Sequence, residues 1–451
     1  MKRITAVLIA ALMLFSLAAC TGANESAPTA APGGNISETS PQGTAETDPA
    51  AAEPTFPPFD AEHEFDNRFA EQTLSICETE DAWYWCTGYL YYLYYYDKPS
   101  GETGPLCGRP ECEHEEKYNN KDCNAYIGHC RDHMQLYEGK LWWVGPNNEK
   151  GDLPNIALWR EDLDGTNREK MGMVTFPDNT HYNPQAYWIH RGRLYMNSMT
   201  PAVDVNSVST SIKLFSTDLN CGDYKLIYER DFDAGGYSYM RFFRQYAYLF
   251  VEYCNYDTEN LRSMEIVRYD SESDTAETIY DGCEFDAGFV WADIDDEGRV
   301  LMAFSGDEYN SVYRLEDGKF TEILGYTGER EGYHALRMYG DRVLAMRTTD
   351  KETWDNDVLF TDYEGNTIYE GKVPRDWTDE FEGNFRFSGF TFGRWIISDD
   401  TFAFLYHLSY PNDSRQRCDY VLVFYTVTDN GLEWTIIGSG TLRTAPPDIS
   451  W

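Results

Sequence analysis

The chain repeats one device: a short strand, a tight turn rich in Gly or Asp, and a returning strand. In residues 158–170 the turn is formed by Asp164, Gly165 and Thr166. Gly and Asp at a turn tip supply the positive φ angles that tight hairpins require. Other segments in which an Asp or Glu ends a strand and a Gly or Asn turns it are residues 93–101, 214–222, 312–318, 358–366 and 423–431, and residues 266–274 are similar but turn over Ser and Glu.

A second kind of hairpin alternates with the first. It joins an apolar strand to an aromatic or aliphatic strand over a Gly or Asp turn. Residues 136–144, 188–196, 294–302 and 338–346 show it clearly, and residues 74–85, 244–251 and 395–405 fit less cleanly. One hairpin of each kind gives about four strands, so the chain holds about seven four-stranded units, roughly 45 to 65 residues apart.

These units predict an all-β fold, a β-propeller with seven blades, or with six or eight. A four-stranded sheet cannot bury both of its faces alone, whereas radial stacking buries them against neighbouring blades. A pair of irregular β-sandwiches would show similar turn signals. We expect residues 300–304 and 343–346 to be inner strands, and the segment near Leu74 to complete the last blade and so close the ring.

The first twenty residues have the form of a bacterial lipoprotein signal. Lys2 and Arg3 precede an apolar run that is too short to span a membrane comfortably and that ends at Ala19 and Cys20. Small residues before a cysteine suit signal peptidase, and the Cys20 thiol can then carry a diacylglycerol. This lipid would attach the protein to the extracytoplasmic side of the cell membrane. An ordinary secretory signal with a chance cysteine is the alternative.

Composition separates the rest of the chain into two parts. Residues 21–58 are rich in Ala, Thr, Pro, Ser and Gly and have almost no large apolar side chain, which predicts a disordered linker. The predicted organisation is a signal peptide at 1–20, this linker at 21–58 and a propeller domain at 59–451. The chain has 76 Asp and Glu against 37 Lys and Arg, which argues against nucleic acid as a partner.

One insertion, residues 105–125, is chemically unusual. It holds Cys107, Cys112, His114 and Cys123 in a loop rich in Gly, Pro and Asn. Thiolate and imidazole suit a tetrahedral Zn²⁺, so these four residues are candidate ligands of a structural zinc, although the spacing is not that of a standard zinc finger. A disulfide among the three cysteines is the alternative, because disulfides persist outside the cytoplasm. Residues that could substitute as ligands follow closely: His129, Cys130 and His133.

The other cysteines, Cys20 apart, are scattered in or beside predicted strands. Cys77 and Cys86 can face each other across the first hairpin. The remainder are expected to be small buried side chains: Cys221, Cys254, Cys283 and Cys418.

The residues around the insertion also carry a resemblance. Gly101 and Pro105 lead into Leu106 and Cys107, then Pro110, Cys112 and His114, and later the run from Cys123 to Ala125. This pattern resembles a group of propeller-type lipoproteins from Gram-positive anaerobes. The Asp-Gly-Thr-Asn turn at 164–167 is similar to turns in TolB-like propellers and their domain-of-unknown-function relatives. The resemblance implies a propeller fold and an extracytoplasmic lipoprotein, and it implies no particular activity.

No catalytic signature accompanies these features. A nucleophile elbow, a dinucleotide fingerprint and a phosphate loop are all missing from the sequence, so no residue is assigned a catalytic or cofactor-binding role. Residues 293–298 resemble the front of a calcium loop, but Phe304 stands where the closing Glu would fall. We expect a membrane-anchored propeller that binds a glycan, a peptide or an envelope protein. The alternative is an extracellular hydrolase or lyase acting on polysaccharide or peptide.

Overall fold

The computed structural model describes residues 57–70, 75–87, 91–113, 123–128, 134–147, 156–174, 184–201, 210–232, 235–254, 262–285, 288–305, 310–350, 355–383, 385–387, 393–410 and 417–442. Within these ranges almost all regular structure is β-strand. The exceptions are the short 3-10 helices η1 (Asn67–Phe69), η2 (Gly328–Arg330) and η3 (Asp376–Glu380). None of the helices in the described ranges is long and apolar enough to cross a membrane.

The strands form seven antiparallel sheets that follow one another along the chain. Blade 1 contains β1 (Ser75–Glu78), β2 (Ala82–Cys86), β3 (Leu93–Asp97) and β4 (Thr103–Pro105). Blade 2 contains β5 (Met134–Tyr137), β6 (Lys140–Pro146), β7 (Ile156–Asp162) and β8 (Glu169–Met173). Blade 3 contains β9 (Pro184–His190), β10 (Arg193–Pro201), β11 (Thr210–Asp218) and β12 (Lys225–Phe232).

The remaining blades repeat this order. Blade 4 contains β13 (Gly235–Phe243), β14 (Tyr246–Cys254), β15 (Arg262–Asp270) and β16 (Thr275–Phe285). Blade 5 contains β17 (Gly288–Ile294), β18 (Val300–Ser305), β19 (Asn310–Glu316) and β20 (Lys319–Gly325). Blade 6 contains β21 (His334–Tyr339), β22 (Arg342–Asp350), β23 (Asp355–Asp362) and β24 (Thr367–Lys372). Blade 7 contains β25 (Arg386–Phe387), β26 (Gly393–Ile396), β27 (Thr401–Ser409), β28 (Cys418–Thr428) and β29 (Gly431–Leu442).

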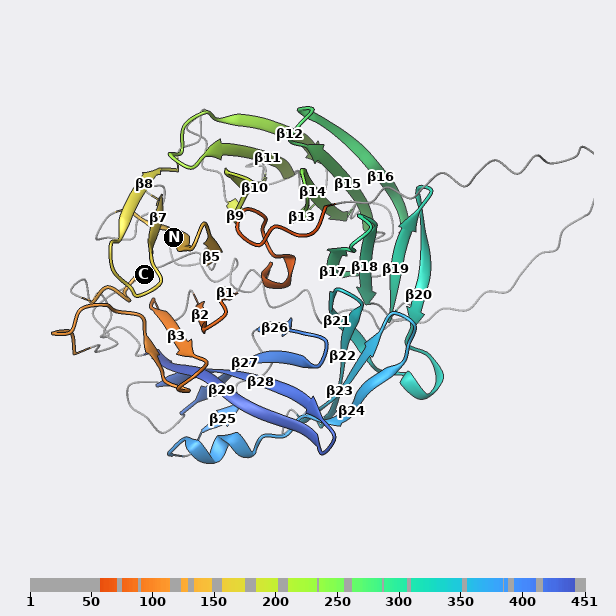
Figure 1. Cartoon of the computed structure of the whole chain (residues 1–451). Coiled ribbons are helices and arrows are strands. Elements are labelled where there is room, and N and C mark those ends of the chain that lie inside the picture. The colour runs from red at the N-terminus through yellow and green to blue at the C-terminus, as the bar shows by residue number, and fades with distance from the viewer. Residues whose placement is uncertain are drawn as a thin grey trace, which may run out of the picture. The chain divides into compact units, whose positions relative to one another are not determined.

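The blades stand side by side around a centre, which makes the fold a seven-bladed β-propeller (Figure 1). First strands of neighbouring blades contact each other, as β13 does with β17 and β17 with β21, so these strands are innermost. Blade 7 meets blade 1 through β29, where Thr103 Oγ1 donates a hydrogen bond to the carbonyl of Ile437 at 2.9 Å. The prediction of an all-β propeller with seven blades is confirmed.

The hydrophobic core is divided into layers between adjacent blades. Between blades 4 and 5, Phe250 and Ile266 pack with Ala292 and Met302, and all four side chains are fully buried. Each blade thereby buries a face that it could not bury alone.

Both predicted kinds of hairpin are present, and each has a fixed place. The hairpins with an Asp or Glu before the turn join the third and fourth strands of a blade, as β7 and β8 do. The apolar hairpins join the first and second strands, as β5 and β6 do.

Two predictions about the arrangement were wrong. Residues 300–304 and 343–346 belong to β18 and β22, which are second strands rather than innermost ones. They are apolar because each lies between two strands of its own sheet and two neighbouring blades. The segment near Leu74 does not complete the last blade, because β1 pairs with β2 in blade 1 and blade 7 is built from β25 to β29.

Polar side chains of the inner strands tie each blade to the next. Gln135 in β5 donates to the carbonyl of Ile189 in β9 at 2.8 Å and accepts from its N–H at 2.7 Å. A buried backbone group without a partner is costly, so such bonds fix neighbouring blades in register. Equivalent links join Ser75 to Met134, Arg241 to Ala292, Trp291 to Met338 and Arg337 to Arg394.

Residues 60–70, here called the N-terminal clasp, lie inside the ring (Figure 1). The buried Glu64 forms ion pairs with Arg191 at 2.8 Å and with Arg244 at 3.0 Å, at the first turns of blades 3 and 4. The side chain of Asn67 bonds both the N–H and the carbonyl of Phe242, at 3.0 and 2.8 Å.

The clasp also contacts blade 1 and blade 7, the first and last blades along the chain. Arg68 donates to the carbonyl of Ile397 in the first turn of blade 7 at 2.7 Å, and it lies 3.4 Å from Glu78 of blade 1. Glu138, in the first turn of blade 2, donates its N–H to the carbonyl of Glu62. The clasp therefore joins distant blades without exchanging a strand.

Candidate metal centre

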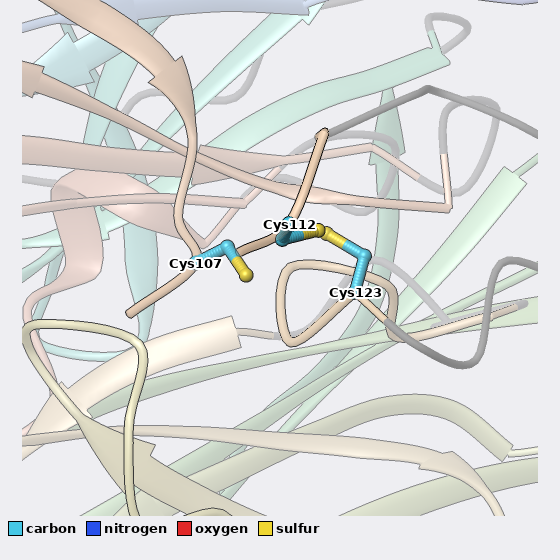
Figure 2. A group of neighbouring side chains, drawn as sticks. All are labelled: Cys107, Cys112 and Cys123. Atoms are coloured by element: carbon cyan, nitrogen blue, oxygen red, sulfur yellow. The ribbon is translucent and has the colours of Figure 1, made fainter. Parts of the chain in front are cut away.

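Three cysteine side chains meet in the connection between blades 1 and 2. The sulfur atoms of Cys107, Cys112 and Cys123 all lie within 4.8 Å of one another (Figure 2). The sequence predicted these three residues as ligands, and the structure brings them together. His114, and the substitutes His129, Cys130 and His133, lie outside the described residues.

Backbone pairing carries Cys123 back to blade 1. Leu93 donates its N–H to the carbonyl of Ala125 at 2.8 Å, and Ile127 donates to the carbonyl of Tyr91 at 2.9 Å. Cys123 and Ala125 are buried in the apolar cluster that contains Trp85. Apolar packing on blade 1 therefore holds the second half of the loop in place.

The segment that carries Cys107 is held in the same way. Leu106 donates its N–H to the carbonyl of Leu93 at 2.8 Å and buries its side chain. A turn follows, in which the N–H of Cys112 bonds the carbonyl of Arg109 at 3.1 Å. This turn folds Cys112 back toward Cys107, so the sulfur atoms converge.

The electrostatics of the cysteines differ from one to the next. Burial opposes ionisation of Cys107, but hydrogen bonds from the N–H groups of Arg109 and Asn124 and from the thiols of Cys123 and Cys112 outweigh it and lower its pKa. The N–H of Asn124 lies 3.4 Å from Cys107 Sγ. Burial raises the pKa of Cys123 to about 12. A cation must therefore displace a proton from Cys123, so metal binding there depends on pH.

The donor set fits a thiophilic cation. Zinc–sulfur bonds of about 2.3 Å in tetrahedral geometry place sulfur atoms roughly 3.8 Å apart, and the three sulfur atoms here all lie within 4.8 Å of one another. Cys107 and Cys123 are both thiols in this structure. A disulfide requires a sulfur–sulfur distance of about 2.05 Å, so Cys107 and Cys123 would have to move to bonding distance to form one.

The outer turn of blade 2 packs directly on this loop, which the sequence did not indicate. Asn124 Nδ2 donates to the carbonyl of Gly165 at 2.8 Å, and the N–H of Gly108 points to the same oxygen at 3.5 Å. A Cβ atom on Gly165 would lie 2.9 Å from the carbonyl oxygen of Leu106 and 3.1 Å from Cys107 Cα. Only a residue without a side chain allows this approach. The turn pattern in the sequence predicts a glycine here but does not predict the close contact that the glycine permits.

Arg168 adds a second link between the turn and the loop. Its guanidinium donates to the carbonyls of Tyr126, at 2.8 Å, and Asn124. The buried carboxylate of Glu161 holds Arg168 at 2.9 Å, and the guanidinium lies over the Trp143 ring. Burial raises the pKa of Glu161 to about 7, although Arg168 opposes the shift.

The other residues singled out in the sequence have structural places. Cys77 pairs with Tyr84 and Cys86 with Ser75, so the two cysteines are not directly opposite each other, and both are buried. Residues 293–298 span the end of β17 and most of the turn to β18, where Asp295 binds Arg299 at 2.7 Å. The side chains of Cys254 and Cys283 lie outside the described part of the chain.

His190 and Asp293 are titratable side chains of the inner strands, and both are buried. His190 accepts the N–H of Phe65 on Nδ1 at 3.0 Å, and its Nε2 lies 2.5 Å from the carbonyl of Arg244. Burial lowers its pKa to about 3, so the ring is neutral and Nε2 is the donor. Burial raises the pKa of Asp293 to about 8. His190 thus serves the clasp and the link between blades 3 and 4.

No protein-family model and no curated protein matches the chain. Among solved structures, it is similar to an oligogalacturonate lyase in complex with manganese, with 11% identity, coverage of 75% of this chain and 83% of that one, and a TM-score of 0.45. It is also similar to the β-propeller domain of the Trilobed protease from Pyrococcus furiosus, with 12% identity, coverage of 70% and 95%, and a TM-score of 0.35.

Proposed function

We propose that this protein is a lipid-anchored, extracytoplasmic binding module. Cys20 carries the lipid, residues 21–58 form the tether, and the propeller binds a glycan, a peptide or an envelope protein. The lipoprotein signal in the sequence supports the anchoring. The same signal, with the cysteine pattern of the insertion, supports membership of the propeller-type lipoproteins that the sequence resembles.

One observation carries the choice of binding over catalysis. Several buried polar side chains of the inner strands are engaged in joining blades or holding the clasp, as Gln135, His190 and Arg241 show. Groups fixed in this way cannot take up or release a proton without loosening the ring. Because the clasp covers the first turns of several blades, the ligand is expected at the opposite end of the ring.

We also propose that Cys107, Cys112 and Cys123 hold a structural Zn²⁺, with His114 as the fourth ligand. Three cysteines and a histidine are a common set for structural zinc, and zinc there would join two segments of the loop. Purified without chelator, the protein should contain one zinc per chain. Cys107→Ser should lose it, and Cys221→Ser, which lies elsewhere, should keep it. A chain without zinc that has lost two thiols would instead establish the disulfide.

The binding function is tested on the soluble domain, residues 59–451, with glycan and peptide arrays. Saturable binding at micromolar concentration, without turnover of the bound compound, is expected. Cleavage of an arrayed polysaccharide or peptide would replace this proposal with the hydrolase or lyase alternative. Anchoring is tested separately, since Cys20→Ser should release the full chain from the membrane fraction.

A further inference from the structure

We propose that the outer turn of blade 2, residues 161–168, sets the geometry of the metal centre, with Asn124 and Arg168 as its positioning residues. This inference rests on the proposed metal binding. Turns of this kind join the third and fourth strands of each blade, and the proposal gives the copy in blade 2 an additional role in positioning metal ligands.

Asn124 connects the ligands to the turn, because its backbone contacts a ligand and its side chain contacts the turn. Its backbone N–H donates to Cys107 Sγ at 3.4 Å, and its side chain donates to the carbonyl of Gly165 at 2.8 Å. It also directly follows Cys123 in the chain. A change in the position of Asn124 therefore moves two of the three sulfur atoms relative to each other.

Arg168 fixes the backbone on the far side of Asn124. It holds the carbonyls of Asn124 and Tyr126, which flank Ala125, and is itself held by Glu161. Because Glu161 is fully buried, the guanidinium has little freedom to follow a displaced loop. The segment that carries Cys123 thus rests on a rigid support.

Close backbone contact completes the platform. A Cβ atom on Gly108, the residue after Cys107, would lie 2.8 Å from the carbonyl oxygen of Asp164. Both arms of the loop therefore rest on the turn, and a cation held by the three thiolates would join these two arms to each other. Groups that orient ligands in this way commonly change metal affinity by about 10- to 100-fold.

The test is a titration of the chelator-treated, reduced full chain with Co²⁺, whose thiolate charge-transfer absorption reports sulfur ligation. Asn124→Ala retains the backbone N–H and loses only the bond to Gly165, and Arg168→Gln removes the second support. Arg160→Gln is the matched control, because Arg160 lies on the same hairpin and pairs with Glu169 at 2.7 Å. We expect Asn124→Ala and Arg168→Gln to weaken Co²⁺ binding by about 10-fold or more and to alter the absorption, with the control unchanged.

The outcomes separate this inference from the metal site itself. If the unmodified chain binds Co²⁺ and both test variants bind it like the control, the positioning role is refuted while the metal site stands. If the unmodified chain binds neither Co²⁺ nor Zn²⁺, the proposed site fails and the inference fails with it. The unfolding temperature of the metal-free Asn124→Ala protein should match that of the control, which excludes general damage to the fold.

Discussion

Gly165 lies so close to the backbone of Gly108 that a Cβ atom on Gly165 would be 3.0 Å from the Gly108 nitrogen. Gly108 lies in the cysteine loop between blades 1 and 2, and Gly165 lies in the outer turn of blade 2. Their close contact packs the cysteine loop against that turn. Gly165 also has a φ of +74°, which other residues adopt only with strain.

Gly165→Ala should therefore destabilise the protein for two separate reasons. The left-handed conformation costs about 1–2 kcal/mol, and displacement of the loop backbone adds to that cost. Gly139→Ala is the control, because Gly139 has a φ of +68° in a turn of the same blade and a Cβ atom added to it would meet nothing within 4 Å. Urea unfolding should show a larger loss for Gly165→Ala, and equal losses would contradict the importance of the contact.

The buried ion pairs of the clasp predict a large effect at Glu64. Glu64→Gln leaves Arg244 buried beside a neutral group, and breaking such a pair commonly costs about 3 kcal/mol or more. Glu62→Gln, at an exposed neighbour, should change the free energy of unfolding by less than about 0.5 kcal/mol. Chemical denaturation of both variants measures the difference, and a small effect at Glu64 would mean that the clasp contributes little.

His190 predicts a specific dependence of stability on pH. Its pKa is about 3 in the folded protein, against an ordinary 6.5, so the unfolded chain takes up the proton first as the pH falls. Stability from this residue is complete above pH 6.5 and is lost by about 1.4 kcal/mol per pH unit down to pH 3. The raised pKa values of Asp293 and Glu161 act in the opposite sense, because the folded protein retains their protons.

A comparison with His190→Gln isolates this term, since Asp293 and Glu161 are the same in both proteins. The difference in unfolding free energy between the unmodified chain and the variant should shrink as the pH is lowered from about 7 to about 5. Parallel profiles would show that His190 does not titrate as its burial requires.

The sequence was sufficient for the blades because a blade is assembled from local hairpins. Turn residues such as Gly165 and Gly318 mark where each strand reverses, and both have positive φ values. Ring closure was mispredicted because it depends on packing of β29 against blade 1 and on side-chain contacts of the clasp, and such contacts between distant segments leave no local pattern. Nothing in the sequence of residues 60–70 distinguishes them from an ordinary segment that leads into a domain. Their contacts through Glu64 and Asn67 are evident only in the folded ring.

The candidate site was predictable in part for the same reason. Cysteine chemistry pointed to Cys107, Cys112 and Cys123, whereas the roles of Asn124 and Arg168 depend on a turn that is distant in the sequence. Glycines at 108 and 165 were a usable signal, because a close approach between two backbones requires both positions to be small. Sequence alone could not show that the two glycines meet.

The clasp also constrains the order of folding. Arg68 is made early in synthesis, but the carbonyl of Ile397 that it binds lies 329 residues later. The docking of the clasp can therefore be completed only after the first turn of the seventh blade has formed. Contacts of such long sequence separation slow folding. The last step of folding should therefore be the complete docking of the clasp, which is the part of the domain that is synthesised first. Until that step, the seven blades can be assembled without the contacts of the clasp that hold them together.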